Sequence, residues 1–168
     1  MNKNNLLLDK INLFFNNENN KNILINILNN KYNISLRIID WFVTNYCKKN
    51  NIYWVKNNYR FVVYLSYKLQ LKAYSKKLFD PFCRRDRIYF YYKDDTYLET
   101  TVGQLNFFKW IIENNIINYI INNYDIIEKD MQYAIKSDNE KTIKRRQLSK
   151  SATKTININD SKTIINFE

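Results

Sequence analysis

The spacing of the apolar residues changes twice along the chain, and this limits the fold more than any other feature. Over residues 4–16 and again over residues 36–46 the apolar residues recur every three or four positions, which predicts short helices. The first stretch carries Leu7, Leu8, Ile11 and then Phe14 or Phe15. Ser35 directly precedes the second stretch and is a suitable N-cap for it.

Between residues 52 and 101 the pattern becomes that of strands. Two pairs of short β-rich runs are each separated by a polar turn, which predicts two β-hairpins. They comprise residues 52–55 with 59–67 and residues 87–92 with 96–101. We expect the hairpins to form one small antiparallel sheet. Between them, residues 68–78 are expected to form a helix that ends before Asp80–Pro81, because the residue before a proline avoids the α region.

Helical spacing returns after residue 101. Thr101 and Gln104 fit a capping box ahead of an apolar run, and residues 102–135 predict two helices with a break near Asn114–Asn115. The fold class is therefore α+β, with short N-terminal helices, a small antiparallel sheet and a C-terminal helical pair. We expect one domain over 1–135, a basic linker or arm over 136–154 and a terminal strand segment over 155–168, which returns to the domain or pairs with a neighbouring chain.

Several classes of enzyme are excluded by missing residue types. The 168 residues include no His and one Gly, so a His-based catalytic triad and a glycine-rich phosphate loop are both ruled out. The two cysteines cannot complete a four-ligand structural zinc site by themselves. We expect no catalytic residue, no metal and no cofactor.

Acidic residues near the hairpins are the remaining candidates for an active site. A metal-dependent nuclease would need several acids around a divalent ion. The acids in this region are Asp80, Asp86, Asp94, Asp95 and Glu99. No nuclease spacing is recognisable among them, so acids of hairpin turns are the better interpretation, and a nuclease is a distant third hypothesis.

The chain is strongly basic, with 27 Lys and Arg against 16 Asp and Glu and a net charge of +11. Residues with AT-rich codons dominate its composition, so part of the lysine excess is explained by codon usage. Arginine runs against that bias, which makes the arginine positions more informative. They cluster at Arg84, Arg85 and Arg87 and again at Arg145 and Arg146.

A basic-aromatic segment over residues 64–92 is the first candidate site. Its cations are Lys68, Lys72, Lys76, Lys77, Arg84, Arg85 and Arg87, and its aromatic residues are Tyr64, Tyr67, Tyr74, Phe79, Phe82, Tyr89 and Tyr91. Cations neutralise phosphates and planar rings stack on bases, which favours nucleic-acid binding. The alternative is a solvated helix face beside core aromatic residues. The second candidate is the arm, with Lys144, Arg145 and Arg146, whose alternative is a charge-rich linker.

Several sequence strings resemble, as a set, small uncharacterised proteins of nucleocytoplasmic large DNA viruses, mimivirus-like ones especially. The strings are residues 67–77, 79–85, 100–110, 127–131 and 145–156, and the resemblance covers about residues 34–168. It implies a viral origin and a place in cytoplasmic infection compartments or virions. No activity, cofactor or catalytic residue follows from it.

Together these observations predict a non-enzymatic viral nucleic-acid-binding protein that acts in genome handling, packaging or transcription. The alternative is a virion structural or assembly protein that binds acidic protein partners through its basic surface. For that role, the apolar region 102–135 could supply a partner surface, although such a run more often belongs to the core. No signal peptide or membrane span is expected, so we place the protein inside the host cell, in the cytoplasm, nucleus or virion. DNA, RNA and viral proteins are the expected partners, and the oligomeric state stays open.

Overall fold

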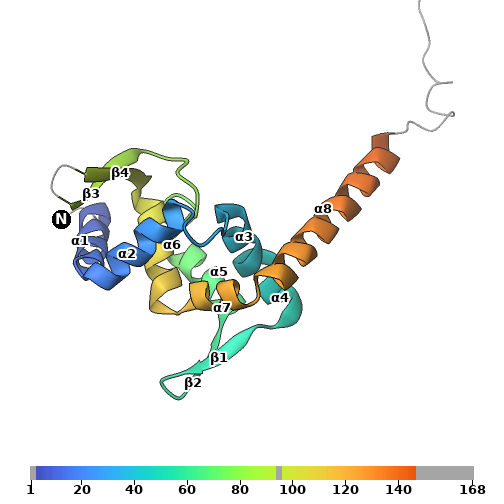
Figure 1. The fold of residues 1–168 in the computed structure, drawn as a ribbon, viewed down its shortest axis with the longest axis horizontal. Helices are drawn as coiled ribbons and strands as arrows, with labels where there is room; N and C mark the ends of the chain where they lie inside the picture. The colour runs from blue at the N-terminus through green and yellow to red at the C-terminus, as the bar shows by residue number, and fades with distance from the viewer. Residues whose placement is uncertain (1–2, 94–95, 147–168) are drawn as a thin grey trace, which may run out of the picture. The chain divides into compact units, whose positions relative to one another are not determined.

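The computed structural model describes residues 3–93 and 96–146, with side chains for residues 5–93 and 96–138. Its helical elements are α1 (Lys3–Phe15), α2 (Glu18–Leu28), α3 (Leu36–Trp41), the π-helical turn η1 (Phe42–Tyr46), α4 (Cys47–Asn50), α5 (Val63–Tyr74), α6 (Val102–Glu113), α7 (Ile116–Asn122) and α8 (Tyr124–Arg146). Its strands are β1 (Tyr53–Lys56), β2 (Tyr59–Val62), β3 (Arg87–Lys93) and β4 (Thr96–Thr101). The α+β class is confirmed (Figure 1). The chain divides into a first unit, Met1–Met131, and a second unit, Gln132–Glu168.

Helices α1 and α3 form where the apolar spacing predicts them, whereas α2 covers a stretch for which no helix was predicted. In α1, Leu7, Ile11 and Phe15 lie four residues apart and are all buried, as expected for one face of a helix. The Ser35 side chain accepts a hydrogen bond from the Ile38 N–H, 3.2 Å away, and so caps α3. The N-cap prediction is therefore confirmed.

Helix α6 is the centre of the core. Nine of its residues are buried, from Gly103 to Ile112, and a helix that is apolar on most sides has to be surrounded by other elements. Helices α1, α2 and α7 and strand β4 pack against it. Most apolar residues of the region 102–135 are therefore core, although Ile121, Ile126 and Tyr133 keep 39%, 59% and 75% of their surface exposed.

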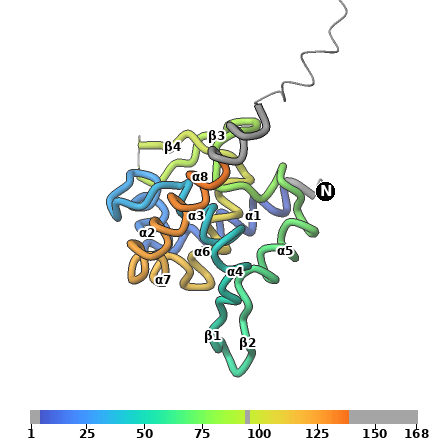
Figure 2. Tube along the Cα trace, turned by 90° about the vertical axis from the view of Figure 1, so that its right-hand side faces the viewer, coloured from blue at the N-terminus to red at the C-terminus, as the bar shows by residue number. Residues whose placement is uncertain are grey.

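The two hairpins form separate two-stranded antiparallel sheets within the described residues, so the expectation of one joined sheet is wrong. The first turn consists of Asn57 and Asn58, both at positive φ, as a tight hairpin turn requires. In Figures 1 and 2 the β1–β2 hairpin extends away from the helices. Trp54 anchors it by stacking on Tyr119, with ring centroids 5.9 Å apart.

The second strand of the first hairpin is shorter than predicted. It ends at Val62, and α5 begins at Val63 instead of near residue 68. The residues of this run favour strands, but Val63 and Tyr67 are buried while Leu65 between them is 58% exposed. A strand would place all three side chains on one face, whereas a helix places only Val63 and Tyr67 together. Helix α5 ends at Tyr74, so Lys76 lies in the following loop and not on the helix face that was expected.

The C-terminal region contains three helices where two were predicted. The expected break at Asn114–Asn115 is confirmed, and a second break at Asn123 separates α7 from α8. The Trp41 Nε1–H donates to the Asp130 carboxylate at 3.1 Å, which fixes the start of α8 against α3. Helix α8 continues to Arg146, so residues 136–146 of the expected linker or arm are helical. The expected terminal strand over 155–168 lies outside the described residues.

Candidate nucleic-acid interface

The candidate interface is built on the loop that joins α5 to β3, residues 75–86, which we call the basic loop. Its backbone is held against the first turn of α6. The Asn106 carboxamide donates to the Leu78 carbonyl at 2.8 Å, and the Gln104 carboxamide donates to the Pro81 carbonyl at 2.8 Å. The Asp80 N–H donates to the Gly103 carbonyl at 3.2 Å. These bonds fix the loop to the most buried helix.

The expected capping box forms only in part. The Thr101 hydroxyl accepts from the Gln104 N–H, as predicted. The Gln104 side chain, however, accepts from the Thr100 hydroxyl at 2.8 Å and donates to Pro81, where a capping box would return it to the backbone of the cap residue. This buried glutamine connects strand β4, helix α6 and the basic loop.

The only glycine of the chain allows this close approach. Gly103 has a negative φ, so its conformation alone does not require glycine. A Cβ atom at this position would lie 2.9 Å from the Lys77 carbonyl oxygen and 3.4 Å from the Leu78 backbone. The loop can therefore reach α6 only because residue 103 has no side chain.

Two of the predicted arginines are held in ion pairs. Arg84 donates to both carboxylate oxygens of Asp80, at 2.9 and 2.8 Å, and Arg87 donates to Glu99 across the β3–β4 hairpin at 2.7 Å. A bidentate arginine–carboxylate pair is the strongest arrangement of this kind. The charges of Arg84 and Arg87 are therefore partly neutralised by their own neighbours.

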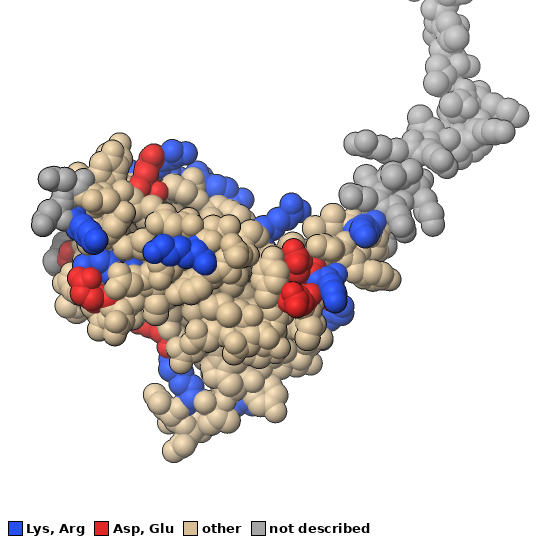
Figure 3. Space-filling model, viewed as in Figure 1, with Lys and Arg blue, Asp and Glu red and all other residues tan. Residues whose placement is uncertain are grey.

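Three cations of the basic loop are exposed and take part in no ion pair within the described part of the chain: Lys76, Lys77 and Arg85. Lys77 and Arg85 line the same small cavity of about 100 Å³, together with Asp86 and the first residues of α6. Figure 3 shows that lysine and arginine side chains on the visible face form separate groups, several of them beside acidic residues. The visible face therefore carries no continuous basic field.

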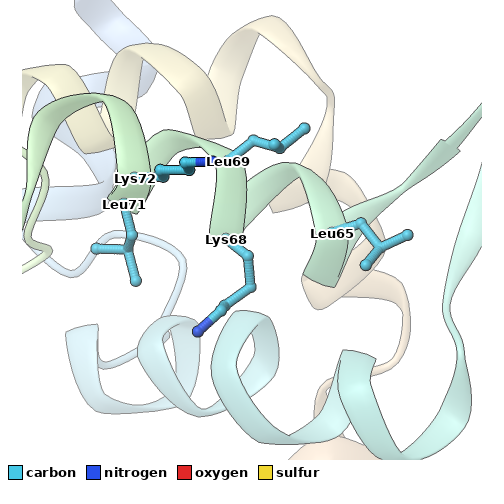
Figure 4. Close-up of a pocket in the computed structure, with 5 residues that line it drawn as sticks. All are labelled: Leu65, Lys68, Leu69, Leu71 and Lys72. Carbon is cyan, nitrogen blue, oxygen red and sulfur yellow. The ribbon is translucent and has the colours of Figure 1, made fainter.

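The lysines of α5 lie beside leucines. Lys68 and Lys72 are exposed and line an open hollow of about 660 Å³ with Leu65, Leu69 and Leu71. In Figure 4, Lys68 and Leu71 point to one side of the helix and Leu69 to the other. Leu65 and Leu69 keep 58% and 66% of their surface exposed. This helix face is amphipathic, with cations placed around apolar side chains.

Only two of the seven predicted aromatic residues belong to the core. Tyr67 and Phe79 are buried, and Tyr64, Tyr74 and Phe82 are half-buried. Tyr89 and Tyr91 are exposed on β3, with 61% and 65% of their surface accessible. Sequence reasoning missed Tyr97 on β4, which is also exposed and lies directly opposite Tyr91 in the hairpin register. That register is the signal that would have identified it.

The remaining predicted cations, Lys144, Arg145 and Arg146, lie in the last turn of α8, where their side chains are outside the described part of the structure. Asp94 and Asp95 of the acidic group are likewise not described. Among the residues that are described, no group of three or more potential ligands is close enough to hold a metal ion. Asp80 and Glu99 instead serve the two arginine pairs.

Asp40 interacts electrostatically with Asp80 of the basic loop. Burial raises the pKa of Asp40, the nearby Asp80 raises it further, and Arg84 and Lys76 lower it. Burial, together with Asp40 and Asp80, also raises the pKa of Tyr67 to about 12. At neutral pH the phenol therefore stays protonated, and the charge of Asp40 opposes folding.

The variant Asp40→Asn is accordingly expected to be more stable than the wild type at pH 7. The folded protein binds the Asp40 proton more tightly than the unfolded chain does, so this carboxyl lowers stability as the pH rises above its ordinary pKa of 3.8. The gain of the variant should disappear as the pH falls below that value. Urea unfolding at pH 7 and at pH 3.5 measures both effects. An equal gain at the two pH values would show that the charge of Asp40 is not the cause.

The described residues form an α+β fold with a cationic loop and no recognisable catalytic site. Comparisons with known proteins identify the family of the chain. The chain belongs to a family of unknown function, DUF7197, whose model matches residues 1–166. It is 45% identical over 127 residues to uncharacterized protein L507 of Acanthamoeba polyphaga mimivirus. That match covers 70% of this chain and 49% of the relative, so the chain spans about half the length of the curated relative.

The resemblance to uncharacterised giant-virus proteins is therefore confirmed. Both matches are described only as uncharacterised or of unknown function, so neither indicates a catalytic family. No solved structure matches this chain. None of the described helices has the length and apolar content needed to cross a lipid bilayer.

Proposed function

We propose that this protein binds nucleic acid without catalysing a reaction, and that it serves genome handling, packaging or transcription in a large DNA virus. The observation that carries the proposal is the basic loop, in which Lys76, Lys77 and Arg85 are exposed and unpaired among the described residues. Because hydrogen bonds to α6 already hold the loop backbone, phosphate binding by these cations costs less backbone freedom than it would in an unanchored loop. The work would take place in the infected cytoplasm or in the virion.

The geometry favours contacts to the sugar–phosphate backbone. Arg85 and Lys77 share one small cavity, and the bonds from Asn106 and Gln104 hold the loop that carries them. Backbone contacts fix a protein on nucleic acid without reading its sequence. Arg84 and Arg87 would contribute less, because each is already held by a carboxylate.

The proposal predicts that Lys77→Ala/Arg85→Ala binds nucleic acid more weakly than the wild type. Each lost phosphate contact should lower the slope of log K against log salt by about 1, so the slope should fall by about 2. Fluorescence anisotropy with a labelled oligonucleotide measures it. Lys31→Ala/Lys129→Ala is the matched control, since both lysines are exposed and the net charge falls equally. Equal losses in the two variants would mean that total charge, and not the loop, causes binding.

A second candidate function, assembly with an acidic protein partner, is favoured by the α5 face. The hollow along this helix combines exposed Leu65 and Leu69 with Lys68 and Lys72, which suits an acidic amphipathic segment better than a phosphate backbone. The variant Leu65→Ser/Leu69→Ser separates the two functions. Under the nucleic-acid proposal its oligonucleotide affinity stays within about twofold of the wild type, because leucines contribute nothing to counterion release.

A further inference from the structure

A second surface with its own chemistry lies on the β3–β4 hairpin. Tyr89, Tyr91 and Tyr97 are 61%, 65% and 53% exposed. The ring of Tyr97 is in contact with both others, with centroids 4.9 Å from Tyr89 and 5.7 Å from Tyr91. We call these three residues the tyrosine cluster.

The hairpin register fixes which face carries the tyrosine cluster. Tyr89 and Tyr91 are two residues apart on β3, and side chains two apart point to the same face of a strand. Phe90, between them, is buried and packs against Phe15 of α1, with ring centroids 5.7 Å apart. The hydrophobic contact of Phe90 therefore holds the tyrosines in place on the opposite, solvent-facing side. The tyrosines are exposed, but the anchored strand keeps their backbone in position.

A cavity of about 380 Å³ lies between β3 and the N-terminal helices. Its lining residues are Asn12, Phe15, Asn16, Lys21, Tyr89, Phe90 and Tyr91. Strand β4 pairs with one edge of β3, so in the described structure the other edge of β3 carries no partner strand. The cavity joins the tyrosine cluster to helix α1.

Two carboxamides are available inside this cavity. Asn12 lies on α1 and Asn16 directly follows its end; both are exposed, and their side chains make no hydrogen bond to any described residue. A carboxamide both donates and accepts, so it can pair with the edge of a nucleobase. Lys21, at the same cavity, is paired with Glu18 at 2.6 Å. The site thus offers ring faces and neutral hydrogen-bonding groups, with little free charge.

This chemistry differs from that of the basic loop. Rings that stack with bases, together with groups that read a base edge, recognise a base and not a phosphate. A base inside a duplex is stacked between its neighbours and paired with its partner base. It cannot reach the cavity unless it is first extruded from the duplex. A cavity of about 380 Å³ is within the size range of small-ligand sites, which is about 300–1,000 Å³.

We propose that the tyrosine cluster and the adjoining cavity bind an unstacked base of single-stranded nucleic acid. This inference rests on the proposed function and names the form of nucleic acid that the protein prefers. The tyrosines stack on bases, Asn12 and Asn16 bond to the edge of one base, and the basic loop contributes phosphate contacts separately. Binding of single strands is therefore tighter than binding of duplex.

The test compares labelled single-stranded and duplex oligonucleotides of equal length by fluorescence anisotropy. Wild-type protein is expected to prefer the single strand. Because stacking on an aromatic side chain contributes about 1–3 kcal/mol per base, Tyr89→Ala/Tyr91→Ala should weaken single-strand binding about tenfold or more and leave duplex binding unchanged. Tyr89→Phe/Tyr91→Phe keeps the rings and should bind nearly as the wild type does. Tyr59→Ala, which removes a tyrosine of the other hairpin that is 77% exposed, is the control.

A second readout reports stacking directly. An oligonucleotide that carries the fluorescent base 2-aminopurine should lose fluorescence on binding to the wild type and to Tyr89→Phe/Tyr91→Phe, but not to the alanine variant. The variant Asn12→Ala/Asn16→Ala should also weaken single-strand binding, and an unchanged affinity would overturn the assignment of the cavity. Circular dichroism melting checks that each variant folds.

The two proposals fail in different ways. If the wild type binds neither form at low salt, the proposed function is wrong and the inference falls with it. If it binds both forms equally, and the alanine variant binds both as the wild type does, the protein is a nucleic-acid binder but the tyrosine cluster is not a base site. In that case an extended peptide pairing with the free edge of β3 becomes the better occupant.

Discussion

Replacement of Phe79 by alanine is expected to lower the free energy of unfolding by about 3–5 kcal/mol, the range for removal of a buried phenylalanine ring. Phe79 is 1% exposed. Its ring contacts those of Tyr67, Phe107 and Trp110, with centroids 6.0, 5.2 and 5.6 Å away. These contacts join α5, the basic loop and α6. Urea unfolding followed by tryptophan fluorescence measures the loss.

The size of this effect has a control within the same loop. Phe82 is half-buried, and Phe82→Ala should cost much less than Phe79→Ala, because less surface is transferred from the core. Phe79→Leu should lie between the wild type and Phe79→Ala. Small domains are stable by only about 5–15 kcal/mol, so Phe79→Ala would remove a large part of the free energy of unfolding. A change of less than about 1 kcal/mol would contradict the packing described for α6.

The second large effect is expected for Gly103→Ala. In an open helical position this change would stabilise the protein by up to about 1 kcal/mol, because alanine has the higher helix propensity. Here the new Cβ would lie 2.9 Å from the Lys77 carbonyl oxygen, a backbone atom that cannot turn aside. We therefore expect a loss of about 1–3 kcal/mol, as for other overpacked sites, measured by urea unfolding.

The sign of the Gly103→Ala effect is the decisive observation. A stabilised variant would show that the basic loop does not approach α6 as closely as described. The same change should weaken oligonucleotide binding, since the residue that must move is Lys77 of the basic loop. Val102→Ala changes a half-buried neighbour and should leave the position of Lys77 intact.

Local signals in the sequence predicted much of the secondary structure correctly. The caps at Ser35 and Thr101 lie where short polar side chains precede apolar helical runs, and both accept the expected backbone hydrogen bond. The turn at Asn57–Asn58 follows from the tolerance of asparagine for positive φ. Each of these signals depends on residues within four positions of one another.

The errors came from interactions between distant residues. The strand predicted to end at Tyr67 became helix α5, which buries Val63 and Tyr67 and leaves Leu65 exposed, so tertiary packing outweighed the strand preference of the run. Pairing of the hairpins into one sheet depends on what packs between them, which local patterns do not contain.

For the candidate site, too, local signals predicted correctly and interactions between distant residues could not be predicted. All seven cations predicted over residues 68–87 are exposed, as their polarity implies. Their availability could not be read from composition, because the pair of Arg87 with Glu99 spans the β3–β4 hairpin. The tyrosine cluster also depends on the hairpin, since Tyr97 joins Tyr91 only through the strand register. Charge and aromatic content could be counted, but the pairing that makes a site required the fold.

The central claim is that this chain binds nucleic acid, and the salt dependence of oligonucleotide binding tests it most directly. The wild-type protein, titrated into a labelled single strand by fluorescence anisotropy between 50 and 200 mM salt, should bind at about micromolar concentration or tighter at the low end. The affinity should fall linearly on a log–log plot, with a slope that reports the phosphates engaged. Absence of binding at the lowest salt would contradict the claim, because the net charge of +11 should hold any accessible phosphate under that condition.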